Sequence, residues 1–232
     1  MRKICDMVVT FSNRKGGVGK SSLCVALANY WANMGLSVCL IDVDPQQSIF
    51  YARCEDLKMY KEIPKYDILK FDLMNNVEKF PEYLRFQKKS GCHILFDVPG
   101  GVENEIFMHV VLLSDFVIVP FQYESYSLDT TGRYGRALQM LKEAFPEYHR
   151  TVIYVPNMVD TRIGRASDRK AWDKWDERIE SVGGIKSPRI PLRACIQRRN
   201  TLFLTPNEEV CLSPCFEFLT KMVFPEMDTK TI

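Results

Sequence analysis

A glycine-rich loop near the start of the chain constrains the fold more than any other feature. Residues 14–21 read RKGGVGKS, directly after the β-branched run MVVTFS and directly before a segment with helical periodicity. In a strand–loop–helix unit of this kind, consecutive backbone N–H groups and the helix N-terminus hold phosphate oxygens. The pattern G-x-x-x-x-G-K-[ST] expects glycine at position 14, where this chain has Arg14. The rest of the pattern fits, so we expect a phosphate-binding α/β unit.

The loop residues have distinct expected roles in binding ATP and Mg²⁺. We expect Lys20 to reach the β- and γ-phosphates and the Ser21 hydroxyl to bind the metal. Lys15 is a second lysine in the loop, and it cannot easily fold back onto the phosphates that Lys20 serves. We therefore expect Lys15 to reach the phosphates of a facing subunit, as an arginine finger does. The residues expected to contact nucleotide here are Lys15, Gly16, Gly17, Val18, Gly19, Lys20, Ser21 and Ser22.

Apolar runs alternate with helix-period segments along most of the chain. Strands are expected at MVVTFS, SVCLID, YDILKF, CHILFDV, DFVIVP and TVIYVPN, with a last one near 187–190. Helical segments are expected at 21–35, 76–90, 102–114, 128–145 and 207–224, the second weakened in its middle by Pro81. The alternation predicts α/β class: a mostly parallel twisted sheet flanked by helices on both faces, in three layers. Because no linker or repeat interrupts it, we expect one domain over residues 1–232.

Acidic residues follow two of the expected strands, where the loops after parallel strands form a ligand crevice. IDVDPQQS places Asp42 and Asp44 two residues apart, so both side chains can face one way. One carboxylate could help to hold Mg²⁺ and the other could orient an attacking water, because phosphoryl transfer needs positioning and charge stabilisation. CHILFDVPGG carries Asp97 at the end of an apolar run, and we expect Asp97 to contact Mg²⁺ through a water. The glycines at 100–101 could move when the γ-phosphate leaves.

KGGVGKS with its early lysine, together with the acidic box D-x-D-P-Q, resembles the deviant Walker A group of P-loop ATPases that includes ParA and MinD. The resemblance runs from residue 8 to about residue 199, and the chain departs from it at Arg14 and in its C-terminal third. It implies a nucleotide-sandwich homodimer joined by ATP, with Lys15 as the cross-subunit lysine. It also implies that Asp44 positions the attacking water, that Asn157 contacts the adenine, and that Pro191 lines the other side of the base.

Positive charge is concentrated in one third of the chain. Residues 161–199 contain eleven basic and five acidic residues, a net charge of +6, whereas the whole chain carries +2 and the remainder −4. This distribution is expected where a protein contacts the phosphate backbone of DNA, and ParA-like partition ATPases bind double-stranded DNA without sequence preference as dimers. A solvated helix face is the alternative. The best candidates for DNA contact are Arg162, Arg165, Arg169, Arg193, Arg198 and Arg199.

The resemblance thus implies slow ATP hydrolysis, stimulated by a ParB-like partner, in the segregation of a plasmid, chromosome or mobile element. Such a protein would be cytoplasmic, and associated with the nucleoid when ATP is bound. The alternative is a MinD-like ATPase that positions a membrane or protein cargo without DNA. That branch ends in a basic amphipathic helix, whereas FEFLTKMVF is followed by Pro225 and acids and is typical of a helix packed on the core. A metal-cluster carrier is disfavoured because the eight cysteines form no CxxC pair.

Overall fold

Seven strands form one sheet in the computed structural model, which describes residues 6–100, 105–160, 162, 166–181, 184–197 and 200–227. The strand order is β3-β2-β4-β1-β5-β6-β7, and every pairing is parallel. The strands are β1 (Val8–Phe11), β2 (Val38–Asp42), β3 (Asp67–Lys70), β4 (His93–Asp97), β5 (Phe116–Phe121), β6 (Thr151–Pro156) and β7 (Ile185–Lys186). The expected parallel α/β fold is confirmed.

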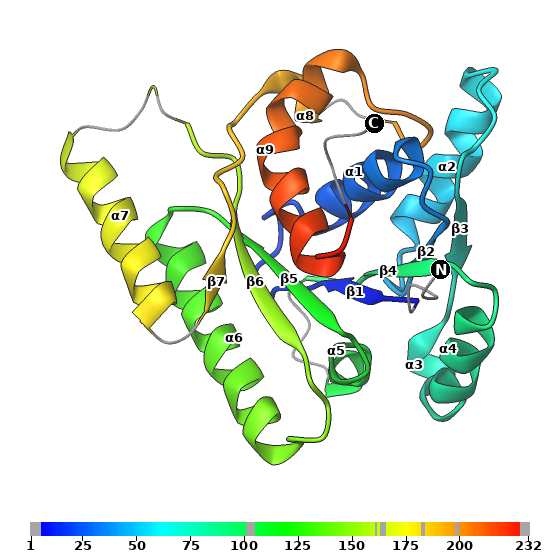
Figure 1. The fold of residues 1–232 in the computed structure, drawn as a ribbon, viewed down its shortest axis with the longest axis horizontal. Coiled ribbons are helices and arrows are strands. Elements are labelled where there is room, and N and C mark those ends of the chain that lie inside the picture. The colour runs from blue at the N-terminus through cyan, green and yellow to red at the C-terminus, as the bar shows by residue number, and fades with distance from the viewer. Residues whose placement is uncertain are drawn as a thin grey trace.

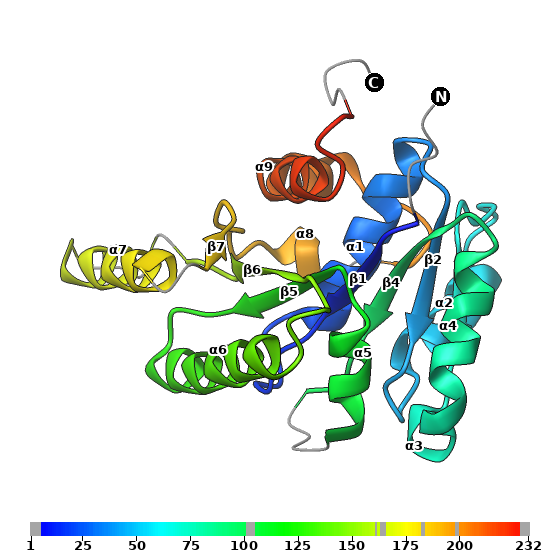
Figure 2. The same cartoon turned by 60° about the horizontal axis from the view of Figure 1, so that its bottom comes forward.

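Helices cover both faces of the sheet (Figures 1 and 2). Side chains alternate along each strand, so Val9 and Phe11 pack with α1 and α9 on one face, while Val8 packs with α4 and α5 on the other. α6 covers β5 and β6 on the same face as α5. The helices are α1 (Lys20–Asn33), α2 (Ser48–Met59), α3 (Leu73–Asn76), α4 (Phe80–Lys88), α5 (Met108–Leu112), α6 (Ser125–Ala144), α7 (Ala166–Ser181), α8 (Ala194–Gln197) and α9 (Pro206–Val223).

The parallel sheet brings the carboxyl ends of distant strands to one edge. The register places Asp97 at the end of β4 beside both Phe11 of β1 and Asp42 of β2. The glycine-rich loop follows β1 directly, so this loop and the two strand-end acids converge although they are up to about 80 residues apart in sequence. The edge where parallel strands end is the usual ligand site in open α/β sheets.

The structure corrects two of the expected elements. The helix expected at 76–90 is broken into α3, a 3₁₀ turn at Val77–Lys79 and α4, and Pro81 lies in the first turn of α4. In that position the missing N–H of proline costs no hydrogen bond, so Pro81 begins a helix rather than weakening one. The last strand is Ile185–Lys186 instead of 187–190, because Pro188 follows closely and cannot donate to a ladder. The sequence patterns also missed α2 and α7.

The C-terminal helix α9 packs on the core, as the sequence predicted. Its buried side chains are Leu212, Cys215, Phe216, Leu219, Thr220 and Val223. Thr205 and Glu208 form a reciprocal capping box at its start, which satisfies two backbone donors that would otherwise be unpaired. Within the described part of the chain, no helix is both long enough and apolar enough to cross a membrane.

Protein stability should fall in acid because of His93, which is only 6% exposed. Its Nδ1 accepts a hydrogen bond from the Met7 N–H at 3.3 Å, and its ring lies 4.6 Å from that of Phe224. Burial lowers the pKa of His93, although Asp6 opposes the shift. The unfolded chain therefore binds more protons below pH ~6.5, and stability decreases as pH falls through that value.

The size of this acid effect has a ceiling. At pH 5.5 it cannot exceed about 1.4 kcal/mol, the free energy of protonating an unfolded imidazole one unit below its pKa. We expect urea unfolding to give a smaller difference between pH 7.5 and 5.5 for His93→Asn than for wild type, because asparagine keeps an acceptor but does not titrate. Equal pH dependence in the two proteins would refute the assignment.

Candidate functional site

The loop between β1 and α1 is shaped by two glycines in the left-handed region. Gly17 has φ 76° and Gly19 has φ 95°, and Gly19 is the residue that precedes the first turn of α1. A side chain on Gly19 would collide with Asn157, whose Nδ2 would lie 2.2 Å from the added Cβ. The loop therefore needs glycine at this position for both its backbone angle and its packing. The loop leads directly into the N-terminus of α1, where backbone N–H groups stabilise a bound anion.

Two asparagines fix the loop to the sheet. The Nδ2 of Asn13 donates to the Pro120 carbonyl at 2.8 Å and to the Thr131 hydroxyl at 2.9 Å, while its Oδ1 accepts from the Lys15 N–H at 3.2 Å. At the other end, the Nδ2 of Asn157 donates to the Val18 carbonyl at 2.8 Å. The loop is thus held by β5, α6 and the end of β6 before any ligand arrives.

Lys20 is buried at the base of the loop, with only 6% of its surface exposed. Its Nζ donates to the Lys15 carbonyl at 3.1 Å. Burial lowers the pKa of Lys20, and the nearby carboxylates of Asp97 and Asp44 oppose this shift. A buried ammonium whose hydrogen bond goes to its own loop is suited to exchange that partner for a phosphate oxygen.

Asp97 is completely buried, and among the described residues neither of its carboxylate oxygens has a hydrogen-bond partner of good geometry, although the Ser21 hydroxyl lies close enough to interact with it. Burial raises its pKa to about 7, against the influence of the Ser21 hydroxyl and the Lys20 ammonium. A buried carboxylate beside a hydroxyl is a set of hard oxygen donors, which fits Mg²⁺. Among the described residues, no three His, Cys, Asp or Glu side chains gather into a metal cluster.

Asp42 and Asp44 differ in their surroundings. Asp42 is fully buried: its Oδ1 accepts from the Asp44 N–H at 3.1 Å, and its Oδ2 accepts from Ile49 and Phe50 at 3.0 and 3.2 Å. These bonds cap the start of α2. Asp44 is half-buried, and its Oδ1 accepts from the Gln46 N–H at 2.8 Å. Asp42 thus supports the local fold, while Asp44 is close enough to Lys20 to oppose the lowering of its pKa.

The segment after β4 lies against the glycine-rich loop. A Cβ added to Gly100 would lie 2.4 Å from Lys20 Nζ, 3.1 Å from Gly16 Cα and 3.3 Å from the Lys15 carbonyl oxygen. Gly100 therefore lets the segment after β4 contact the glycine-rich loop, so a ligand that displaces one of them would also displace the other. Gly101 lies outside the described residues.

The two residues expected to hold the base lie in different settings. Asn157 is buried behind the loop, and its Oδ1 has no hydrogen-bond partner. Pro191 forms an isolated bridge with Val159 and lines a cavity of about 320 Å³ together with Val159, Arg169, Trp172 and Arg189. The ring of Trp172 stacks on Tyr123 at 5.2 Å. The cavity has the apolar and aromatic walls that suit a planar ring.

Three residues at this edge were not identified from the sequence. Gln122 Nε2 donates to the Gly17 carbonyl at 3.4 Å and to Met158 Sδ at 2.8 Å, and Met158 has a positive φ of 55°. Tyr126, in the first turn of α6, lies under the Lys15 ammonium. Gln122 follows the end of β5 by one residue and Met158 that of β6 by two, and this position was the signal that could have found them.

The structure divides the basic residues that were expected to contact DNA. Arg162 pairs with Asp160 at 2.9 Å, and Arg169 and Arg193 are exposed. Arg165, Arg198 and Arg199 lie outside the described residues. Two other basic residues of this region are half-buried and paired: Arg189 and Lys186 both bind Asp176, at 2.7 and 2.8 Å. Part of the +6 charge therefore stabilises α7, and Arg193 is the clearest exposed candidate.

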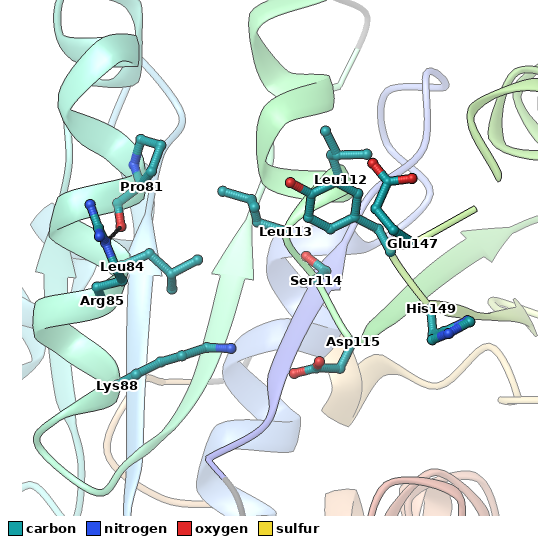
Figure 3. Close-up of a pocket in the computed structure, with 11 residues that line it drawn as sticks. Pro81, Leu84, Arg85, Lys88, Leu112, Leu113, Ser114, Asp115, Glu147 and His149 are labelled. Atoms are coloured by element: carbon teal, nitrogen blue, oxygen red, sulfur yellow. Dashed lines mark hydrogen bonds between the residues drawn. The ribbon is translucent and has the colours of Figure 1, made fainter. Parts of the chain in front are cut away.

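A second cavity, of about 460 Å³, lies at the opposite end of the sheet (Figure 3). Leu84, Arg85 and Lys88 of α4 form one wall, and residues 147–149 before β6 form another. Asp115, which precedes β5, also lines it. Because these residues lie at the amino ends of the strands, this cavity is remote from the glycine-rich loop.

The sheet topology and the loop at the end of β1 define a P-loop nucleotide-binding fold. The family model described as the CobQ/CobB/MinD/ParA nucleotide binding domain matches residues 9–190, and the chain belongs to this family. The resemblance to the ParA/MinD group expected from the sequence is confirmed.

Individual relatives agree with this assignment. The chain is 47% identical over 146 residues to the chromosome-partitioning ATPase Soj of Thermus thermophilus, covering 52% of this chain and 57% of Soj. The chain spans 57–66% of the length of the curated relatives it matches. Among solved structures, a putative plasmid partition protein of Borrelia burgdorferi bound to AMPPNP has a TM-score of 0.65 at 18% identity, covering 93% of this chain and 98% of that one. The MinC:MinD complex of Aquifex aeolicus has a TM-score of 0.69 at 16% identity, covering 97% and 98%.

Proposed function

We propose that this chain is an ATP-dependent DNA partition ATPase, with residues 1–232 acting as one ATPase domain. ATP binding joins two subunits in a sandwich, the dimer holds double-stranded DNA without sequence preference, and hydrolysis to ADP and phosphate releases it. A ParB-like protein stimulates hydrolysis, and the ATP-bound dimer is associated with the nucleoid. The relatives named Soj and the family match support this reading.

The observation that carries the proposal is the direction of Lys15. Its backbone is fixed within the loop, but its ammonium lies over the ring of Tyr126, a residue that is 69% exposed. Lys20 already occupies the base of the same loop. A lysine that leaves the loop outward is placed to reach a phosphate held by a second subunit.

In this proposal the loop residues bind and orient the triphosphate. The backbone N–H groups from Gly16 to Ser22 and the start of α1 hold its oxygens, and Lys20 exchanges the Lys15 carbonyl for the β- and γ-phosphates. Ser21 and Asp97 hold Mg²⁺, with Asp42 nearby; when bound, the ion neutralises developing charge on the phosphate oxygens. Asp44 orients the attacking water. Asn157 contacts the adenine, and Pro191 lines the other side of the adenine ring.

DNA binding is assigned to the basic third of the chain. Among the described candidates, Arg193 is exposed, and its Nη1 contacts the Leu192 carbonyl at 3.3 Å. Arg169, Lys170 and Lys174 add exposed charge on α7. Acidic residues on the same helix weaken this patch, so binding should depend strongly on salt and on the doubling of charge in a dimer.

The test is binding to unrelated duplex DNA at low and moderate salt, with ATP, with ADP and without nucleotide. We expect binding only with ATP, and its loss in Lys15→Gln and Lys20→Ala. The slope of the logarithm of the DNA-binding constant against the logarithm of the salt concentration should fall by about one in Arg193→Ala. It should stay unchanged in Arg85→Ala, which lies at the far end of the sheet. Dimerisation without DNA binding in any state would favour the MinD-like alternative, a membrane- or protein-cargo-positioning ATPase. Absence of ATP-driven dimerisation would reject both.

A further inference from the structure

The Lys15 ammonium lies 4.7 Å from the centre of the Tyr126 ring. Tyr126 is the second residue of α6, directly after the turn that follows β5, and the residue is 69% exposed. A cation over an aromatic face at this distance is attracted by the electron density of the ring.

The backbone of Lys15 is hydrogen-bonded on both sides. Its N–H donates to Asn13 Oδ1 at 3.2 Å, and its carbonyl accepts from Lys20 Nζ at 3.1 Å. Asn13 is in turn bonded to Thr131 on α6, the helix that carries Tyr126. The backbone of Lys15 and helix α6 are therefore held together, and the aliphatic stem of the lysine spans the distance to the Tyr126 ring.

The ring is the partner that the structure gives to this ammonium. Among the described residues, no carboxylate lies within ion-pair distance of Lys15 Nζ. A cation–π contact at an exposed site is weak, and it corresponds to roughly a two- to fivefold bias between two positions. A hydrogen bond from an ammonium to a phosphate is considerably stronger. The ring can thus hold the lysine in a lone subunit and release it to a phosphate.

We propose that Tyr126 is the resting contact of Lys15 in the unpaired subunit, and that it sets how readily ATP-bound subunits join. Tyr126 is a positioning residue, because it acts on ATP only through Lys15. The proposal rests on the cross-subunit role of Lys15 proposed above. In the unpaired state the ring holds the ammonium near its own subunit, and dimerisation replaces the ring by a phosphate of the partner.

The resting contact can be tested without nucleotide. In protein carrying ¹³C-labelled lysine, the ε-methylene protons of Lys15, assigned with Lys15→Gln, should be shifted upfield by the ring. Tyr126→Phe should keep the shift, and Tyr126→Leu should abolish it. Phe86→Leu is the control, because Phe86 on α4 is 70% exposed but is remote from the loop. An unshifted Lys15 signal in wild type, or one unchanged in Tyr126→Leu, would overturn the proposal.

The consequence for pairing is tested by sedimentation with a non-hydrolysable ATP analogue. Tyr126→Leu should tighten the dimer by roughly two- to fivefold for each of the two lysines released, and Tyr126→Phe should match wild type. A weaker dimer in Tyr126→Leu would mean that the ring contacts the partner subunit instead, and would overturn the proposal. If wild type itself does not dimerise, the cross-subunit role fails, while the lysine signal still decides whether the ring holds Lys15.

Discussion

Replacing Gly19 with alanine is expected to lower the affinity for ATP by roughly 10- to 100-fold, because holding an L residue in an unfavourable backbone region costs about 1–3 kcal/mol. The added Cβ would lie 2.2 Å from Asn157 Nδ2, and the residue would have to keep a φ of 95° that L side chains rarely adopt. The loop must therefore open, or Asn157 must leave the Val18 carbonyl. Titration calorimetry with ATP and Mg²⁺ measures the loss directly.

Two other glycines separate the causes of this effect. Gly17 also has a positive φ, but an added Cβ there meets no atom within 4 Å, so Gly17→Ala should report backbone strain alone. Gly132, within α6, has ordinary backbone angles and free space, and Gly132→Ala should leave binding unchanged while stabilising the protein by about 0.5–1 kcal/mol. Adding Asn157→Ala to Gly19→Ala should restore part of the affinity. Near-normal binding by Gly19→Ala itself would contradict the packing argument.

Elements with an apolar stripe were predictable from sequence, and those held by polar contacts were not. α1 buries Leu23, Leu27 and Trp31 at helical spacing, so its pattern is visible. α2 buries only Ile49 and Arg53, and the Arg53 guanidinium binds the Thr201 and Tyr66 carbonyls at 2.7 and 2.9 Å. A helix whose anchor is an arginine bonded to a segment 148 residues away leaves no periodicity to detect.

Helix α7 was missed from the sequence for the same reason as α2. It is anchored through Asp176, which accepts hydrogen bonds from Tyr123, Lys186 and Arg189. In the sequence, Lys186 and Arg189 could not be distinguished from surface charge, although both support the fold. Local charge counts cannot distinguish an internal ion pair from a binding face, because the pairing depends on which strands are neighbours.

In the candidate site, too, some residues could be predicted from the sequence and others could not. The glycine loop and the strand-end acids could be found because their residue types and spacing follow from how phosphate is held. The contacts of Lys15 with Tyr126, and of Gln122 with Met158, join segments more than 30 residues apart. Such contacts depend on the packing of α6 and β6 around the loop, which no local pattern encodes.

Asp97→Asn should change stability and activity in opposite directions. Without nucleotide and metal, the carboxylate is fully buried, the nearby Ser21 hydroxyl hydrogen-bonds it only weakly, and burial raises its pKa to about 7. Exchanging it for a neutral amide removes the cost of a buried charge, so the nucleotide-free protein should gain stability, on the order of 2 kcal/mol at pH 7.5. Urea unfolding in the presence of a chelator measures this gain.

The same substitution should reduce Mg²⁺-dependent ATP hydrolysis by at least about 100-fold, because the site loses its charged metal-facing oxygen. Asp44→Asn is the matched control: Asp44 is half-buried and bonded to the Gln46 N–H, so its replacement should lower hydrolysis without stabilising the protein. A destabilised Asp97→Asn would mean that the carboxylate has a structural partner. An active Asp97→Asn would mean that the metal is held elsewhere. Together, the two measurements show whether the Asp97 carboxylate lowers the stability of the nucleotide-free protein and is needed to bind a cation.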